Sequence, residues 1–128
     1  MDIAKKLQDI HSIVFKNFTY VTDKKKHGQE EYWEVIPESF TAGNKLTSDC
    51  EDFAMTCRKL CRDQAIRPTR LVVCLDETGA GHCVMECLGY VLDNRYDKLV
   101  TKNFLEGEGY KWLAISGELP GQQWTKVN

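Results

Sequence analysis

The sequence predicts an α+β domain in which helices come first and an antiparallel sheet follows. Apolar residues at steps of three and four cover 2–18, and a second such pattern begins near residue 48. Short β-branched and apolar segments, separated by turn residues, then occupy 70–116. Helices that precede a set of strands in this way are typical of α+β folds.

The composition limits the classes of partner that we expect. The chain has 128 residues, enough for one domain with one core, and we expect residues 1–128 to form a single domain. Its formal net charge is −2 and no basic stripe is present, so we expect no nucleic-acid partner. The apolar runs are far too short for a membrane span, and the N-terminal segment lacks the apolar stretch of a signal peptide. We therefore expect a cytosolic monomer without a membrane partner.

The first part of the chain contains three predicted segments. An amphipathic helix is expected over 2–18, an exposed polar loop over 22–31, and a short helix over 37–42. Pro37 suits the first position of that short helix, and Gly43 suits its end. The apolar face of the first helix is formed by Ile3, Leu7, Ile10, Val14 and Phe18.

A second long helix is predicted to begin close to Cys50. The residues at 47–49 are all good N-cap residues, and Ser48 with Glu51 fits the capping-box pattern. Pro68 prevents the helix from continuing. The predicted buried face consists of Cys50, Phe53, Ala54, Cys57, Leu60 and Cys61.

Four strands are expected after this helix. The segment 70–76 is β-branched and apolar and predicts a central strand. The segments 82–89 and 90–96 predict two strands joined by a tight turn at Leu88–Gly89, and 109–116 predicts a fourth.

Six cysteines are many for this length, and two pairs are spaced by four residues: Cys57 with Cys61, and Cys83 with Cys87. Without a secretion signal, a disulfide framework is not expected. Residues four apart on a strand are separated by roughly 13 Å, which is too far for one zinc ion. We interpret most of these cysteines as small buried hydrophobic residues.

Cys50 is a candidate nucleophile because it lies at the predicted start of a helix. The positive end of the helix dipole stabilises a thiolate, whereas Asp49 and Glu51 on either side of the cysteine oppose its ionisation. A thiol nucleophile also needs a general base, usually a histidine oriented by a carboxylate or amide. His82 opens the second predicted strand and Asp93 lies in the third.

The pairing of the two strands tests whether His82 and Asp93 can meet. In an antiparallel hairpin with a two-residue loop, the sequence numbers of the two residues in each cross-strand pair add up to the same odd number. With Leu88–Gly89 as the loop, Val84 faces Asp93, and His82 lies on the same face one diagonal step away. Such diagonals measure roughly 7 Å between backbones, within reach of longer side chains. A three-residue loop would put the two side chains on opposite faces.

Each of these residues also has an ordinary structural interpretation. A cysteine on an apolar helix face is usually part of the core, and a single histidine at the start of a strand is usually a surface residue or one whose hydrogen bonds are satisfied. An aspartate followed by asparagine usually forms a turn. Cys50, His82 and Asp93, each at the end of an element, are nevertheless the residue types of a thiol-dependent catalytic site.

Four motifs in order resemble the bacterial transglutaminase-like cysteine proteinases, the group that includes the LapG-type proteases. The chain contains "SDCEDFAMTCRKL", then "GAGHC", then "YVLDNRY", and finally "YKWL". They correspond to the family's D-C-E-D-[YF]-A box, G-H strand, V-L-D-N strand and late Y-x-W-L. Together with the preceding "YW…P…F" pattern, the resemblance covers roughly residues 32–113. The combination is specific, although any one motif alone would be weak.

The resemblance implies a papain-like, transglutaminase-like core in which the nucleophile helix packs on an antiparallel sheet. It implies that Cys50 is the nucleophile, His82 the general base and acid, and Asp93 the carboxylate that orients the histidine. LapG-type members bind calcium through the acids that flank the cysteine, so Asp49 and Glu51 would be calcium ligands here. A cation at that place would offset their charge beside the thiolate. The alternative for Glu51 is a plain capping box.

The expected reaction is acyl transfer on a peptide or side-chain amide of a protein or peptide substrate. Hydrolysis of the thioester would make the protein a cysteine peptidase or amidase, and attack by an amine would make it a protein-crosslinking transglutaminase. A non-catalytic binding module that keeps the fold is a third possibility, against which the complete Cys–His–Asp set argues. Cell-wall amidases of the related Cys–His type usually show a D-C-S-G box, where this chain has D-C-E-D.

Overall fold

The described part of the chain folds into three helices and one antiparallel sheet. The computed structural model describes residues 2–16, 48–118 and 122–127. Its helices are α1 (Ile3–Lys16), α3 (Ser48–Asp63) and α4 (Lys102–Gly107). Its strands are β1 (Arg70–Leu75), β2 (Gly81–Cys87), β3 (Tyr90–Leu92), β4 (Val100–Thr101), β5 (Lys111–Ile115) and β6 (Thr125–Lys126). The predicted α+β class is confirmed.

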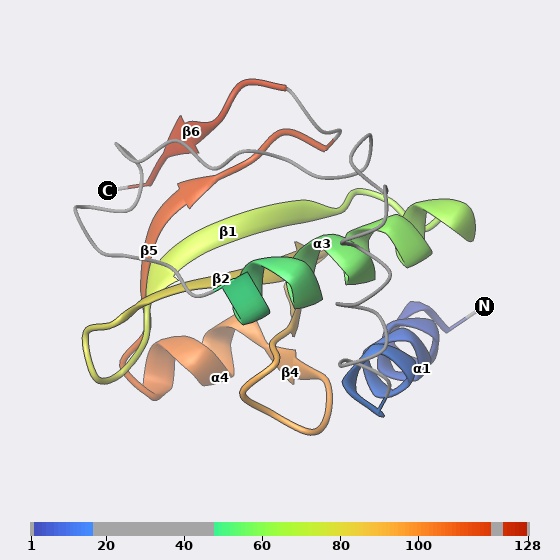
Figure 1. Ribbon diagram of the computed structural model, residues 1–128, viewed down its shortest axis with the longest axis horizontal. Helices are drawn as coiled ribbons and strands as arrows, with labels where there is room; N and C mark the ends of the chain where they lie inside the picture. The colour runs from blue at the N-terminus through green and yellow to red at the C-terminus, as the bar shows by residue number, and fades with distance from the viewer. Residues whose placement is uncertain (1, 17–47, 119–121, 128) are drawn as a thin grey trace.

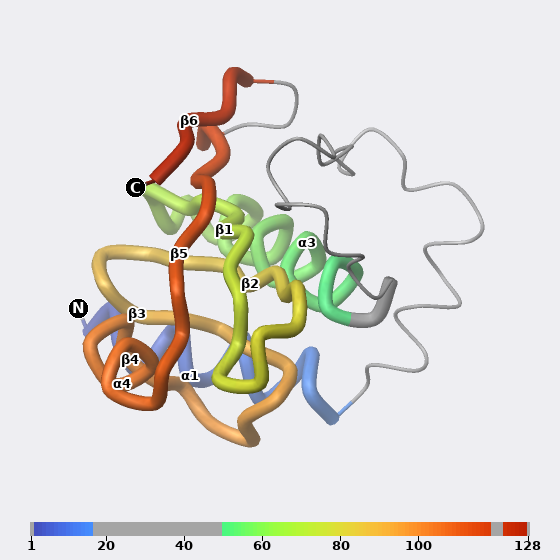
Figure 2. Tube along the Cα trace, turned by 90° about the vertical axis from the view of Figure 1, so that its left-hand side faces the viewer, coloured from blue at the N-terminus to red at the C-terminus, as the bar shows by residue number. Residues whose placement is uncertain are grey.

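The sheet has the strand order β4-β3-β2-β1-β5-β6, and every neighbouring pair is antiparallel. β1 lies near the centre, as its β-branched and apolar sequence predicts. Helix α3 lies across β1 and β2, with α1 beside it (Figure 1). Helices α3 and α4 lie on opposite sides of the sheet (Figure 2).

Alternation along the strands gives the sheet two apolar faces. On β1, Leu71 and Val73 belong to the core under α1 and α3, whereas Val72 and Cys74 belong to a smaller cluster that includes Leu105 of α4. This is the period-two pattern of a strand buried on both sides. The sheet therefore forms the middle layer of the described structure.

Helix α1 forms where the periodic apolar residues predict it. Leu7, Ile10 and Val14 are buried against the core, whereas the predicted Phe18 lies outside the described residues. The expected loop over 22–31 and the short helix over 37–42 also lie outside them.

Helix α3 places Cys50 in its first turn, as predicted. The helix begins at Ser48, and the side chains of Ser48 and Asp49 are outside the described part of the structure, so the capping box stays a prediction. The predicted face is buried except for Leu60, which is half-buried. Arg58 and Met55, which the apolar pattern does not include, are buried too.

The β2–β3 hairpin has the predicted two-residue loop. Its pairs are Met85↔Leu92, Glu86↔Val91 and Cys87↔Tyr90, which leaves Leu88–Gly89 as the turn. Both turn residues have positive φ, 53° and 89°, as a type I′ turn requires. Continuing the register by one step puts Val84 opposite Asp93.

The predicted strand over 90–96 is too long, because β3 ends at Leu92. Asp93 ends it by forming a turn, in which its carboxylate accepts a hydrogen bond from the backbone N–H of Arg95 (2.9 Å) and its carbonyl accepts one from Tyr96 N–H (3.3 Å). Asp93 therefore follows the strand instead of lying in it.

The later part of the chain contains elements that the pattern does not predict. β4 and α4 follow the turn, and Thr101 caps α4 by accepting a hydrogen bond from Phe104 N–H (3.1 Å). The strand predicted over 109–116 is present as the shorter β5, and β6 pairs with it. No helix among the described residues is long and apolar enough to span a bilayer.

Candidate active site

His82 and Asp93 are in direct contact at the end of the β2–β3 hairpin. His82 Nε2 lies 2.7 Å from Asp93 Oδ1, and the two residues are 5% and 0% exposed. This contact follows from the two-residue loop. The loop sets a register in which Val84 lies opposite Asp93, so that His82, two residues before Val84, is on the same face of the sheet as Asp93. The geometric prediction that the two side chains meet is correct.

The carboxylate of Asp93 is held by three donors. Oδ1 accepts from His82 Nε2 and from the backbone N–H of Arg95, and Oδ2 accepts from the hydroxyl of Tyr110 at 2.8 Å. Three hydrogen bonds compensate for burying a charged group at this place. The carboxylate is thereby fixed in position beside the imidazole.

Cys50 reaches this pair from the first turn of α3. Burial by itself lowers the pKa of His82. The hydrogen bonds of the histidine to Asp93 and Cys50, together with the negative charges of these two groups, outweigh the effect of burial and raise the pKa to about 9. Because Nε2 is bonded to Asp93, Nδ1 is the ring nitrogen available to Cys50. The structure thus brings Cys50, His82 and Asp93 together from α3, β2 and the turn after β3.

The other five cysteines have a different environment. Burial raises the pKa of Cys57, Cys74 and Cys83, and it raises those of Cys61 and Cys87 to about 12 and about 11. All five are buried thiols within the two apolar clusters. They behave as the small core residues that the sequence predicts, because burial disfavours the thiolate.

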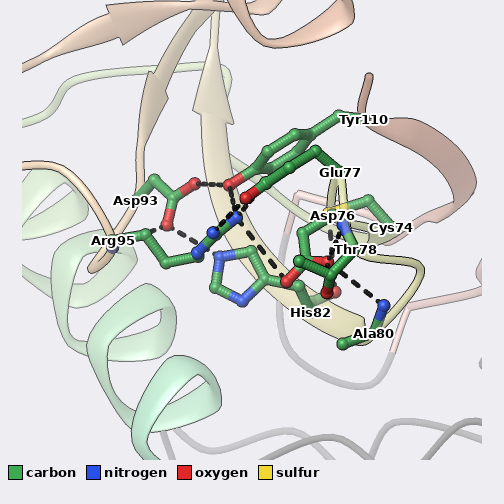
Figure 3. A network of polar contacts seen from close by, with 9 residues as sticks. All are labelled: Cys74, Asp76, Glu77, Thr78, Ala80, His82, Asp93, Arg95 and Tyr110. Carbon is green, nitrogen blue, oxygen red and sulfur yellow. Dashed lines mark hydrogen bonds and ion pairs between the residues drawn. The ribbon is translucent and has the colours of Figure 1, made fainter. Parts of the chain in front are cut away.

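Tyr110 and Arg95 extend the site outward from Asp93 (Figure 3). Arg95 donates from Nη1 to the hydroxyl of Tyr110 (2.9 Å), lies over its ring, and forms a two-pronged ion pair with Glu77. Asp76, whose carboxylate lies 3.5 Å from Arg95 Nη1, organises the turn between β1 and β2. Arg95 thus connects the β1–β2 turn to the Tyr110 hydroxyl, which donates a hydrogen bond to Asp93.

The sequence patterns did not single out Tyr110 or Arg95. Tyr110 belongs to the late Y-x-W-L motif, so its place in that motif is the signal that could have identified it. Arg95 lies two residues after Asp93, in a turn where the chain pattern predicts a strand. Its contact with Glu77 joins residues 18 positions apart, which no local pattern indicates.

The predicted calcium ligands are only partly described. Glu51 is half-buried in the first turn of α3, and its charge acts on the nearby Cys83 thiol. The side chain of Asp49 is not among those described. Within the described ranges, no group of three His, Cys, Asp or Glu side chains could hold a metal ion.

Comparison with known proteins identifies the family. Neither a curated protein nor a solved structure matches the chain. The family model described as "Bacterial transglutaminase-like cysteine proteinase BTLCP" matches residues 1–128, which is the whole sequence. The resemblance seen in the motifs is thereby confirmed, and a transglutaminase-like fold agrees with the observed α+β architecture. The chain belongs to the bacterial transglutaminase-like cysteine proteinases.

Proposed function

We propose that this protein is a cysteine peptidase that uses Cys50, His82 and Asp93 as a catalytic triad. The observation that carries the proposal is the 2.7 Å contact between His82 and Asp93 with Cys50 hydrogen-bonded to the same imidazole. A nucleophile, a base and a group that orients the base are the parts that thiol-dependent acyl transfer needs. The family of the chain supports the same reaction class.

The proposed reaction begins with a proton on the imidazole. The raised pKa of His82 keeps the ring protonated at neutral pH. In the proposed reaction, this positive charge favours the thiolate form of the sulfur that lies beside it. The thiolate attacks an amide carbonyl, and a C–S bond forms while the carbonyl π electrons move to oxygen. The backbone N–H of Cys50, at the positive end of α3, is the proposed donor to that oxyanion.

His82 then acts as the acid. Its Nδ1–H protonates the departing amine as the C–N bond breaks, which leaves a thioester on Cys50. Water, deprotonated by the now neutral imidazole, attacks the thioester carbonyl and forms a C–O bond. The C–S bond then breaks, which releases the acid product and restores the thiolate beside the protonated ring. Asp93 holds Nε2–H throughout, so the ring keeps the tautomer whose Nδ1 faces the sulfur.

Alkylation with iodoacetamide across pH, measured for each cysteine by mass spectrometry, tests the triad. We expect Cys50 to react far faster at neutral pH than the five thiols whose pKa burial raises, and to react about a hundredfold more slowly in the His82→Ala variant. Cys50 is only 1% exposed, so the comparison between wild type and variant matters more than the absolute rate. A Cys50 that is as inert as Cys57 in both proteins would exclude the triad and favour a binding module.

We further propose, from the family resemblance, that Asp49 and Glu51 take part in binding calcium. Calcium supplies positive charge beside the thiolate when it is bound, and hard carboxylate oxygens suit it. Repeating the alkylation series with calcium and with a chelator tests this, as does a calcium titration followed by calorimetry. We expect Glu51→Gln to weaken binding, and an absence of heat in the wild type would exclude the site.

Transamidation is a second candidate because the site is so deeply buried. Cys50 and His82 are 1% and 5% exposed, and exclusion of water from a thioester favours attack by an amine. Incubation of a glutamine-containing protein with a fluorescent primary amine separates the two reactions. Fluorescence that becomes attached to the protein indicates transamidation, and new peptide termini indicate proteolysis.

A further inference from the structure

Helix α1 contacts both ends of the segment that carries Asp93. This segment, the 93–99 loop, connects β3 to β4. At its start, His11 Nε2 lies 3.0 Å from the carbonyl oxygen of Asp93. At its end, the backbone N–H of Leu99 donates to Gln8 Oε1 at 2.9 Å. Gln8 and His11 are three residues apart and therefore lie on one side of the helix.

The surroundings of His11 define its protonation state. The side chain is fully buried, with the rings of Phe15 and Phe53 at 5.6 Å and 5.4 Å. Burial lowers its pKa, so the imidazole is neutral near pH 7. A carbonyl oxygen can only accept, so the single ring proton is on Nε2, and the buried Nδ1 has no hydrogen-bond partner among the residues that the structure describes. Through this proton His11 donates to the backbone carbonyl of Asp93.

The backbone of Asp93 has little other support. The residue lies just beyond the last ladder pair of β3, and its carbonyl otherwise accepts only the long 3.3 Å hydrogen bond from Tyr96 N–H among the contacts of the described residues. The orientation of this peptide group determines where the carboxylate points. In catalytic sites a misplacement of about 1 Å costs about a hundredfold in rate.

We infer that α1 belongs to the catalytic apparatus, with His11 as a positioning residue that fixes the backbone of Asp93 and Gln8 as the residue that fixes the far end of the 93–99 loop. The inference rests on the proposed triad. It explains why a polar side chain interrupts the apolar face formed by Leu7, Ile10 and Val14. It also assigns the helix a role that hydrophobic packing alone would not require.

Two amide variants of matched polarity test the inference on the full chain. In His11→Gln the amide nitrogen reaches about as far as Nε2, whereas in His11→Asn it falls short of the Asp93 carbonyl. We expect His11→Asn to slow alkylation of Cys50 at neutral pH by about ten- to a hundredfold. We also expect it to raise the pH at which the rate is half-maximal, because a loosely held Asp93 stabilises the imidazolium less. His11→Gln should restore most of both properties.

Two further variants complete the experiment. Gln8→Leu should also slow the alkylation of Cys50, but by a smaller factor than His11→Asn. It serves as the test if His11→Asn does not fold. Asp9→Asn, on the exposed side of α1, is the control that should change nothing. Thermal unfolding of each variant separates a loss of stability from a loss of positioning, since a purely structural role would leave the pH midpoint unchanged.

The possible outcomes separate this inference from the proposed function. If wild-type Cys50 does not differ from Cys50 in His82→Ala, the triad itself is wrong. If the triad behaves as proposed but His11→Gln and His11→Asn share one rate and one pH midpoint, the role of α1 is overturned.

Discussion

Two buried histidines lie on either side of Asp93, and their surroundings move their pKa values in opposite directions. His82 faces the carboxylate, and its hydrogen bonds raise its pKa to about 9 in spite of burial. His11 faces the backbone carbonyl between two aromatic rings, and burial lowers its pKa. Asp93 and Asp97 are the charged groups near His11, and both act against that lowering.

These shifts predict how stability depends on pH. A raised folded-state pKa means that His82 stabilises the fold fully below 6.5 and loses that contribution as pH rises toward 9. For His11 the sign is opposite, so its contribution is present above 6.5 and is lost as pH falls. We expect the melting temperature of the wild type to fall both at acid pH and at alkaline pH. The fall at alkaline pH should be smaller in His82→Gln, and the fall at acid pH should be smaller in His11→Gln. If melting temperature depended on pH in both variants as it does in the wild type, the pKa directions assigned to His82 and His11 would be wrong.

The sequence could identify the residues of the proposed triad but not the residues that hold them in place. Cys50, His82 and Asp93 lie in recognisable motifs, and hairpin parity predicts that the latter two meet. His11 makes its contact across 82 positions, and the only local sign of it is a polar residue within an apolar helix face. Tyr110 was predicted as a strand residue, and nothing in its neighbourhood indicates that its hydroxyl reaches Asp93 from 17 positions away.

At the level of elements, the β2–β3 turn determines whether His82 and Asp93 meet. A longer loop would change the register and move one of the two side chains to the other face. Leu88 is an unusual residue here, because it is 58% exposed and holds φ at 53°. Glu86 supports the turn by accepting a hydrogen bond from Gly89 N–H at 2.8 Å.

Leu88→Asn should stabilise the protein. Asparagine adopts the left-handed conformation more readily than leucine and is preferred before glycine in type I′ turns, so we expect a gain of about 0.5–1 kcal/mol in the free energy of unfolding. Leu88→Ala removes the same exposed apolar surface without easing the backbone and should have little effect. Urea unfolding measures both, and equal stability of the two variants would show that the turn is not strained.

Elements were predictable where their patterns are long. Helix α1 and β1 appear close to the expected ranges because periodicity is clear over several turns or a full strand. Helix α4 has six residues, too few for a periodic signal, and it is defined by its cap at Thr101. The end of β3 was missed because Asp93 bonds to its own turn instead of continuing the ladder.

At the scale of the whole molecule, the sheet joins two apolar clusters that share its central strands. Val84 and Met85 are neighbours on β2, and each is fully buried in a different cluster. Loosening one layer therefore disturbs the strand that also supports the other. We expect the described elements to unfold together.

Met85→Ala tests this coupling. A buried methionine replaced by alanine should lower the free energy of unfolding by about 2–5 kcal/mol. Urea transitions followed by far-ultraviolet circular dichroism and by tryptophan fluorescence should still coincide. Lys111→Ala, at an exposed position of β5, should change stability by less than about 0.5 kcal/mol. Two separate transitions in the Met85 variant would show that the layers unfold independently.

The β2–β3 hairpin also has a consequence for the order of folding. His82 and Asp93 are separated by 11 residues, whereas His11 must close a span of 82 residues to reach the same aspartate. The entropy lost on closing a loop grows with its length, so the imidazole–carboxylate pair is the part of the site that forms at least cost. Cys50 meets this pair only when α3 docks on the sheet. We therefore expect the pair of His82 and Asp93 to form before Cys50 reaches it during folding, so that the thiol gains its proposed base only after α3 has docked.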